Sequence, residues 1–276
     1  MILVTSAAGR TGGMVARILH GQGRAVRAFD RNPRLSVVPA AERMSGNMLD
    51  KDDLRSACEG VESIIHTGPM SADESTMGLW LIDAAKAAGV GHFVYHSVMH
   101  SQTEWLLNHK NKARVENHLI DSGLPFTILQ PMHYFQNIDV PRIVETGVLR
   151  SAYSETVALS HVDMADLAEV SAKVVGRVKH HYATYEICGG DHFNTAYLVE
   201  CLSRHLGKPI RNEKVSVEAL LADFGMPSEG YFGDFLHRLM MYYNRNGIRG
   251  NANVLEWLLG RPATTLSQYI ERSVRS

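Results

Sequence analysis

The turn near the start of the chain contains residue types that can hold the phosphates of a dinucleotide. It spans residues 6–12, Ser-Ala-Ala-Gly-Arg-Thr-Gly, between an apolar run and an amphipathic segment. Glycine in such a turn lets the backbone approach a pyrophosphate, and the N-terminus of the following helix presents free N–H groups. The usual first glycine is Ser6, so a glycine-rich turn without a ligand is the alternative. The flanking strand and helix signals favour a dinucleotide site contacted by Gly9, Arg10, Thr11 and Gly12.

Acidic and basic residues at the end of the next predicted strand favour different cofactors. Asp30 follows Gly9 by about 20 residues, which is the spacing of the acid that binds the adenosine ribose and favours NAD. Arg31 and Arg10 carry guanidinium groups that would pair with the 2′-phosphate of NADP. The sequence therefore predicts an NAD(P) site with NADP slightly favoured. A solvated surface role for Arg31 is the alternative.

The first half of the chain alternates between short apolar runs and helical periodicity. This alternation predicts a parallel sheet with helices on both faces, an α/β Rossmann-type doubly wound fold. The predicted strands are 2–5, 25–30, 42–47, 63–69, 92–97 and 126–130. The predicted helices lie around 14–19 and at 52–60, 75–88 and 103–121.

The second half of the chain has a different pattern, which predicts a smaller lobe. We expect an NAD(P)-binding domain at 1–155, with its sheet completed by about 156–190, and a mostly helical C-terminal substrate lobe at 191–276. The lobe is expected to lie over the C-terminal edge of the sheet. Its segment 229–247 is rich in methionine and aromatic residues, which suit a planar apolar ligand. Packing in a helix core is an equally weighted alternative.

The composition excludes several classes of function. Hydrophobic residues make up 45% and charged residues 21% of the 276 residues, and the net charge is -1. The net charge therefore gives no general electrostatic attraction to nucleic acid or to an anionic membrane, and no run of Lys and Arg is present. No apolar run reaches the roughly 20 residues that span a bilayer. The three dispersed cysteines favour a reduced cytoplasmic setting, and His96 and His100 lack a third ligand, so we expect no metal.

Several motifs together resemble one known family. They are VTSAAGRTGG at 4–13, RNP at 31–33, AAGVGHFVYHS at 87–97, KARVENHLIDSGLPFTILQP at 112–131 and LEWLLGRPATTL at 255–266. Over nearly its whole length the chain is similar to the NmrA-like atypical short-chain dehydrogenases. That group includes quinone and triphenylmethane-dye reductases, isoflavone-reductase-like enzymes and redox-sensing regulators. The resemblance implies that residues after successive strands line the cofactor groove, namely Gly9 to Gly12, Arg31, Asn47, Met48, Thr67, Gly68 and Pro69.

The resemblance also implies a catalytic centre without its usual acid. Typical short-chain dehydrogenases use a YxxxK helix, in which the tyrosine donates a proton and the lysine holds the nicotinamide ribose. Lys112 occupies the lysine position, but Asn108 stands at the tyrosine position. Isoflavone-reductase-like relatives have the lysine without the tyrosine. The resemblance therefore implies that Lys112 positions the cofactor or acts as acid/base. An exposed helix lysine is the alternative. Ser97 matches the family's serine, or caps a turn.

The missing tyrosine favours acceptors that need no strong acid. A positioned donor contributes roughly 10²–10⁴ in rate when an alkoxide forms, whereas a quinone, a cationic dye or a conjugated enone spreads the developing charge. Histidines near the predicted groove, such as His109 and His133, are candidate proton donors. The predicted substrate contacts are Met70, Met99, His100, Tyr134 and Phe135.

Three functions fit these residues. The first is an NAD(P)H-dependent reductase that transfers hydride to a small aromatic, quinone-like or conjugated carbonyl substrate. The second is a non-catalytic NAD(P)-binding redox sensor of the NmrA type, which Asn108 and Ser6 would allow. The third is an epimerase, dehydratase or lyase with tightly bound NAD, supported by Asp30 alone. Lys112 and the aromatic segment favour the reductase, acting as a monomer or a homodimer.

Overall fold

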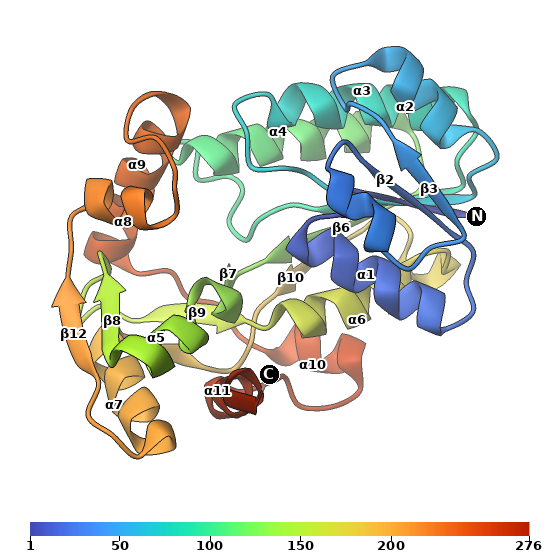
Figure 1. Cartoon of the computed structure of the whole chain (residues 1–276). Helices are drawn as coiled ribbons and strands as arrows, with labels where there is room; N and C mark the ends of the chain where they lie inside the picture. Colours follow the sequence, from blue (N-terminus) through green and yellow to red (C-terminus); the bar gives the residue numbers. More distant parts are fainter. Residues whose placement is uncertain (276) are drawn as a thin grey trace. The chain divides into compact units, whose positions relative to one another are not determined.

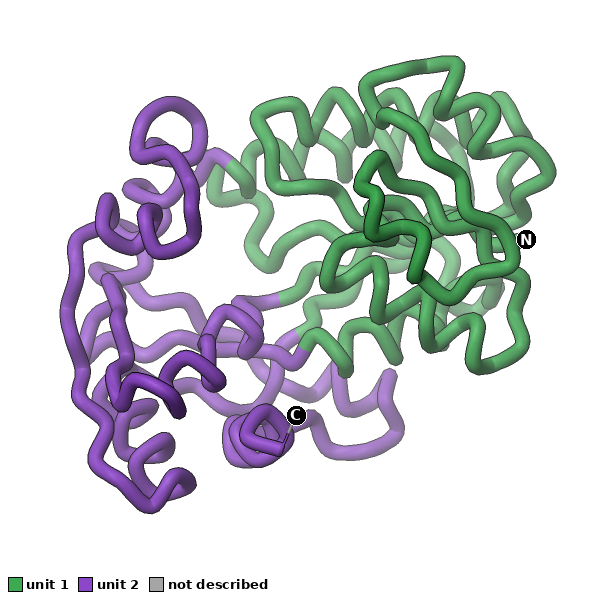
Figure 2. Tube along the Cα trace, viewed as in Figure 1, with its two compact units in different colours: residues 1–104, 108–131, 164–187 green, residues 105–107, 132–163, 188–276 purple. Residues whose placement is uncertain are grey.

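The computed structural model describes residues 1–275, which form two compact units. Unit 1 contains residues 1–104, 108–131 and 164–187, and unit 2 contains 105–107, 132–163 and the chain from 188 onward (Figure 2). The sequence suggested a division near residue 190, whereas residues 132–163 group with the C-terminal residues. The physical reason is strand pairing, because strands within 132–163 form hydrogen-bonded ladders with strands beyond residue 188.

Unit 1 is built on a seven-stranded parallel sheet with the order β10-β6-β5-β4-β1-β2-β3. The chain winds outward in both directions from β1, and folds with such a reversal of strand order bind ligands beyond the carboxyl ends of the strands at that point, here β1 and β4. This topology confirms the predicted α/β Rossmann-type class. The strands are β1 Ile2–Thr5, β2 Val26–Asp30, β3 Glu42–Ser45, β4 Ser63–Thr67, β5 His92–His96, β6 Phe126–Pro131 and β10 Ala183–Ile187.

Helices cover both faces of this sheet (Figure 1). On one face, α1 (Arg10–Gly21) packs on α6 (Met164–Val174). On the other face, α2 (Lys51–Cys58), α3 (Glu74–Ala87) and α4 (Leu107–Ser122) bury their apolar sides against the strands. The sheet and these helices together fix the loops at the carboxyl ends of the strands, where the predicted cofactor-binding residues other than Lys112 lie.

Unit 2 combines short strands with helices. Two small sheets have the orders β11-β9-β7 and β12-β8. The strands are β7 His133–Tyr134, β8 Val148–Ser151, β9 Leu159–Val162, β11 His192–Phe193 and β12 Arg211–Lys214. The helices are α5 Val140–Thr146, α7 Thr195–Leu206, α8 Val217–Asp223, α9 Gly230–Asn246, α10 Asn253–Leu259 and α11 Leu266–Arg275. The expectation of a mostly helical C-terminal segment thus holds for α7 to α11, with two short strands in addition.

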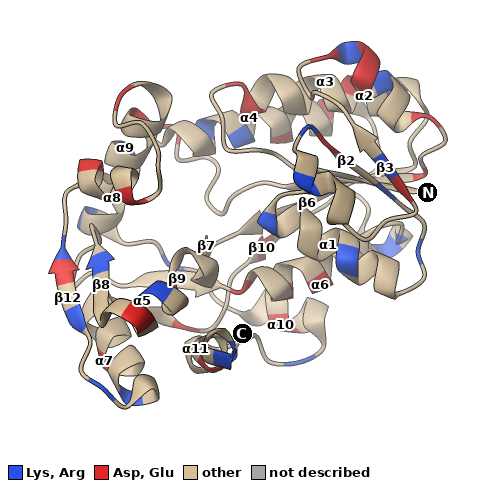
Figure 3. Ribbon diagram, in the orientation of Figure 1, with Lys and Arg blue, Asp and Glu red and all other residues tan. Residues whose placement is uncertain are grey.

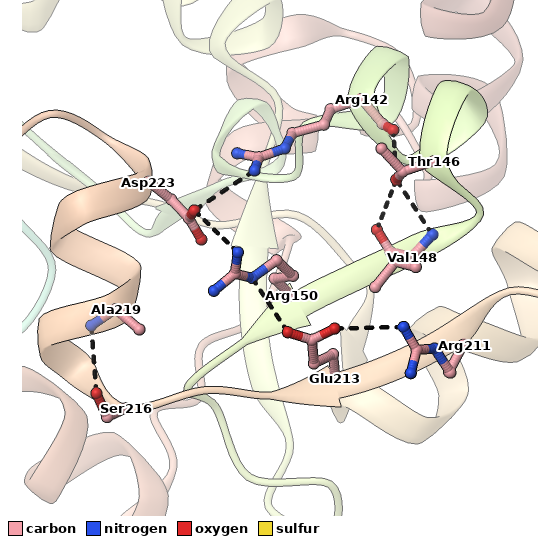
Figure 4. Close-up of polar contacts among 9 residues, drawn as sticks. All are labelled: Arg142, Thr146, Val148, Arg150, Arg211, Glu213, Ser216, Ala219 and Asp223. Atoms are coloured by element: carbon pink, nitrogen blue, oxygen red, sulfur yellow. Dashed lines mark hydrogen bonds and ion pairs between the residues drawn. The ribbon is translucent and has the colours of Figure 1, made fainter.

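A chain of alternating charges joins four elements of unit 2 (Figure 4). Asp223, at the end of α8, lies 3.4 Å from Arg142 on α5 and 3.2 Å from Arg150 on β8. Glu213 on β12 lies 3.5 Å from Arg150 and 3.4 Å from Arg211. Each carboxylate thus contacts two guanidinium groups, which ties α5, β8, β12 and α8 together.

Charges of both signs are interspersed along the elements of each unit (Figure 3). This agrees with the formal net charge of -1. Within residues 1–275, no helix has both the length and the apolar character needed to cross a bilayer.

Candidate functional site

The glycine turn has a backbone geometry that only small residues permit. Ser6 adopts a left-handed conformation with φ 47°, so its carbonyl oxygen points back at the start of α1. A Cβ on Gly12 would lie 2.4 Å from that oxygen, and one on Gly9 would lie 3.1 Å from it. Gly12 therefore has no room for a side chain. Ser6 provides the turn that glycine usually makes, at a modest conformational cost.

The start of α1 fits a phosphate group. Gly9 occupies the N-cap position and supplies no side-chain cap, and the first turn contains no acidic residue. The first N–H groups of a helix have no partner within it, and the helix dipole adds a partial positive charge. Arg10 and Thr11 follow directly, with Arg10 exposed. The residues present therefore suit the pyrophosphate of a dinucleotide.

Asp30 binds the turn itself. Its Oδ2 accepts a hydrogen bond from Ala8 N at 3.0 Å, and its Oδ1 accepts one from Asn32 N at 2.9 Å. Asn32 in turn caps a short 3₁₀ helix by accepting from Arg34 N at 2.9 Å. Arg31 between them is exposed. Both carboxylate oxygens of Asp30 thus already stabilise the loop that a ribose would approach.

The loops after β3 and β4 differ in what they present. The Asn47 side chain accepts from Leu49 N at 3.0 Å and is exposed, whereas the Met48 side chain is packed in the core. After β4, Thr67 is buried and donates from Oγ1 to Thr5 O at 2.8 Å, which ties β4 to β1. Gly68 and Pro69 are partly exposed. A ligand along this edge would therefore contact the backbone of Met48 rather than its side chain.

Lys112 lies in a buried polar setting that we call the lysine centre: Lys112, Glu74, Tyr95 and His96. Its ammonium pairs with the Glu74 carboxylate, donates to His96 O at 3.1 Å and lies 5.4 Å from the centroid of the Tyr95 ring. The side chains of Lys112 and Glu74 are 14% and 2% exposed. The alternative, an exposed helix lysine, therefore does not hold. Glu74 was not singled out from the sequence, because an acid in the first turn of a helix is commonplace.

Ser97 belongs to a second buried network around Glu116. Ser97 donates to Glu116 Oε1, which also accepts from Gln130 Nε2 at 2.8 Å. Ser101 donates to Glu116 Oε2 at 2.7 Å. Because its proton is directed at Glu116, Ser97 presents acceptor lone pairs to any other partner. Glu116 was also missed from the sequence, where it resembles an ordinary polar helix residue.

The first turn of α4 carries buried acceptors. Asn108 stands at the position of the missing tyrosine, and its Oδ1 is buried without a hydrogen-bond partner. Nε2 of His109 is also buried without a partner. His109 donates from Nδ1 to His100 O at 2.9 Å, and burial lowers the pKa of His109 to about 4. His109 is therefore neutral at pH 7 with an acceptor at Nε2, which opposes a role as proton donor.

The predicted substrate contacts of unit 1 separate into exposed and buried side chains. Met70 is 44% exposed, and His100 is partly exposed with its Nε2 3.8 Å from Glu186. Met99 is fully buried. Met70 and His100 therefore have surface to offer a ligand, whereas Met99 contributes packing.

In unit 2, His133 belongs to a histidine–aromatic cluster: His133, Phe135, Tyr153, His161 and Phe193. Tyr153 OH and His133 Nε2 are 3.2 Å apart, and burial lowers the pKa of His133 to about 4 and raises that of Tyr153. His161 stacks on Phe193 with ring centroids 4.3 Å apart. Phe135 is fully buried beside them, so its side chain offers no surface to a ligand.

Other aromatic residues of unit 2 divide between surface and interior. Tyr134 is partly exposed. In α9, Phe235, Leu239, Met240 and Tyr243 are buried, so the apolar stripe of the 229–247 segment serves largely as helix core, while Met241 is exposed. Within residues 1–275, no three His, Cys, Asp or Glu side chains gather as a metal site requires.

The sheet order and the glycine turn define a Rossmann-type protein of the dinucleotide-binding class. The sequence matches the NmrA-like family over residues 1–272, and the chain belongs to that family. It is similar to quinone oxidoreductase 2 of Escherichia coli (strain K12), with 28% identity covering 98% of this chain and 97% of that protein.

Two further comparisons extend this likeness. The chain is 30% identical to (4-alkanoyl-5-oxo-2,5-dihydrofuran-3-yl)methyl phosphate reductase of Streptomyces griseus subsp. griseus, covering 95% of this chain and 94% of that protein. The crystal structure of the NADPH-dependent quinone oxidoreductase from Escherichia coli, complexed with NADPH, superposes with a TM-score of 0.85 at 26% identity and covers 99% of both chains.

Proposed function

We propose that this protein is an NADPH-dependent reductase of small quinone-like or conjugated carbonyl compounds. The observation that carries the proposal is the combination of a glycine turn that suits a pyrophosphate with an amide, Asn108, at the position where a tyrosine is usually the acid. The similar proteins are named for reduction of quinones and of an oxo-dihydrofuran, whose ring double bond is conjugated to a carbonyl. Such acceptors delocalise the charge that hydride addition creates.

The balanced reaction is acceptor plus NADPH plus one proton giving reduced acceptor plus NADP⁺. The bound nicotinamide supplies the hydride. Lys112 is proposed to hold the nicotinamide ribose through its ammonium. Ser97 directs its proton at Glu116, so it could accept a hydrogen bond from a hydroxyl of the bound cofactor but would not donate one to the acceptor's carbonyl. Because His109 is neutral, with its Nδ1 proton held by His100 O, we assign the proton to solvent rather than to His109.

The proposed preference for NADPH rests on Asp30 and Arg31. Asp30 already accepts two backbone hydrogen bonds from the loop. Arg31 is exposed next to it, and its guanidinium would pair with a 2′-phosphate. Direct titration should give a lower Kd for NADPH than for NADH, and Arg31→Ala should weaken NADPH binding by about tenfold while changing NADH binding little. Equal affinities in the wild type would remove the preference.

Thermal stabilisation by each reduced cofactor is the first test of the function. The second test follows the absorbance of the reduced nicotinamide against a panel of quinones, enones and aryl aldehydes, with quinones and enones expected to turn over fastest. Stabilisation without turnover across the panel would favour the redox-sensor alternative, which Asn108 and Ser6 allow. Failure of both cofactors to stabilise the protein would overturn the proposal.

A further inference from the structure

The ammonium of Lys112 has a defined set of partners inside unit 1. An ammonium has three N–H donors and no acceptor. One contacts the Glu74 carboxylate and one donates to His96 O at 3.1 Å, so one donor remains for a ligand. The face of the Tyr95 ring, with its centroid 5.4 Å away, closes another side. The direction of the third donor is therefore fixed by the other two.

Glu74 also contacts the loop that is predicted to border the cofactor. A Cβ on Gly68 would lie 2.9 Å from Glu74 Oε1, so glycine at this position lets the loop backbone pass close to the carboxylate. Glu74 is 2% exposed, and a buried carboxylate without a positive partner is strongly unfavourable. Glu74 thus connects the Thr67–Pro69 loop to the lysine of α4.

We propose that Glu74 is a positioning residue for cofactor binding: it holds the Lys112 ammonium so that the remaining N–H is available to the nicotinamide ribose. This inference rests on the proposed reductase function. Glu74 acts through Lys112 and does not itself touch the cofactor. Its effect must therefore disappear when Lys112 is absent.

The test is a double-mutant cycle with Glu74→Gln and Lys112→Met. It measures the Kd of NADPH by direct titration, kcat and KM with a quinone, and Tm. Glu74→Gln should raise the Kd of NADPH by about tenfold and lower kcat/KM for NADPH by a similar factor, while KM for the quinone changes little. In the Lys112→Met background, Glu74→Gln should change Kd by less than about twofold and raise Tm, because it removes the unpaired carboxylate.

The inference would be overturned if Glu74→Gln raised the Kd of NADPH by the same factor with and without Lys112→Met. It would also be overturned if Glu74→Gln alone left that Kd at its wild-type value. If Glu74→Gln alone does not fold, the double variant is compared with Lys112→Met, and a several-fold weaker binding in the double variant would contradict the proposal. Glu169→Gln is the matched control, because Glu169 pairs with Lys173 on the surface of α6. If the wild type binds neither cofactor, the proposed function fails instead.

Discussion

The lysine centre of unit 1 and the histidine–aromatic cluster of unit 2 use opposite means to bury polar groups. The lysine centre keeps its charges and pairs them, with Glu74 against Lys112. The histidine–aromatic cluster keeps its polar groups neutral, since burial lowers the pKa of His133 to about 4 and raises that of Tyr153. Paired charges suit a polar, anionic cofactor, and neutral stacked rings suit an apolar environment. Each arrangement predicts its own response to mutation and to pH.

The largest effect is expected in the histidine–aromatic cluster. Phe193→Ala removes a buried ring that stacks on His161, and it should lower the free energy of unfolding by about 4 kcal/mol. Denaturant unfolding measures this loss. Tyr197→Ala is the control, because Tyr197 is 49% exposed, and it should cost less than about 1 kcal/mol. Similar losses in the two variants would show that the stack contributes little.

Removal of one charge from the lysine centre should have the next largest effect. Lys112→Met leaves the Glu74 carboxylate buried and unpaired, so the free energy of unfolding should fall by about 3 kcal/mol. Adding Glu74→Gln should restore most of that loss. Lys173→Met, which breaks a surface pair, should cost less than about 0.5 kcal/mol. A loss in Lys112→Met as small as in this control would mean that water stabilises the carboxylate.

The pH dependence of stability tests the neutral character of His133. Its folded pKa, about 4, lies below its ordinary value of 6.5. The unfolded chain therefore binds a proton that the folded chain does not, so stability falls as the pH decreases from about 6.5 toward 4. His133→Gln should make that decline shallower, because the variant takes up as much as one proton fewer on unfolding than the wild type. An unchanged slope in urea titrations at several pH values would show that His133 protonates in the folded state.

The smallest effect is expected at the glycine turn, which lies in unit 1 outside the lysine centre. Ser6 has a φ of 47°, a conformation that glycine adopts without strain. Ser6→Gly should change cofactor affinity by less than about tenfold, or roughly 1.4 kcal/mol. Isothermal titration with NADPH measures the change. A larger loss would mean that the Ser6 hydroxyl itself contributes to binding.

The sequence predicted the elements of unit 1 well, because hydrophobic periodicity and glycine turns are local signals. Each predicted strand is present within a few residues. The division into units was predicted less well. Residues 132–163 belong with the C-terminal chain because β8 pairs with β12 and β9 with β11, and such long-range pairing leaves no local mark.

The sequence also predicted the positions of site residues without predicting which side chains contact them. Lys112 and Ser97 were identified by resemblance, but Glu74 lies 38 residues before Lys112 in the chain. Glu74, in the first turn of its helix, and Glu116, in the middle of another, have the sequence pattern of surface residues. Only the packing of the helices shows that both are buried. Met99 and Phe135 were expected to contact substrate, yet both side chains are fully buried. Their apolar character alone cannot distinguish a pocket wall from a core.

The sequence alone determined the parallel α/β architecture, the glycine turn and the amide at the usual acid position, since each depends on residue type and local spacing. The tertiary structure decided which charges are paired. Burial of Glu74 beside Lys112 makes an unremarkable acid into the partner of that lysine. Burial of His133 and His109 keeps two candidate acids neutral at pH 7. Desolvation and pairing depend on the whole fold, so only the packed structure could assign them.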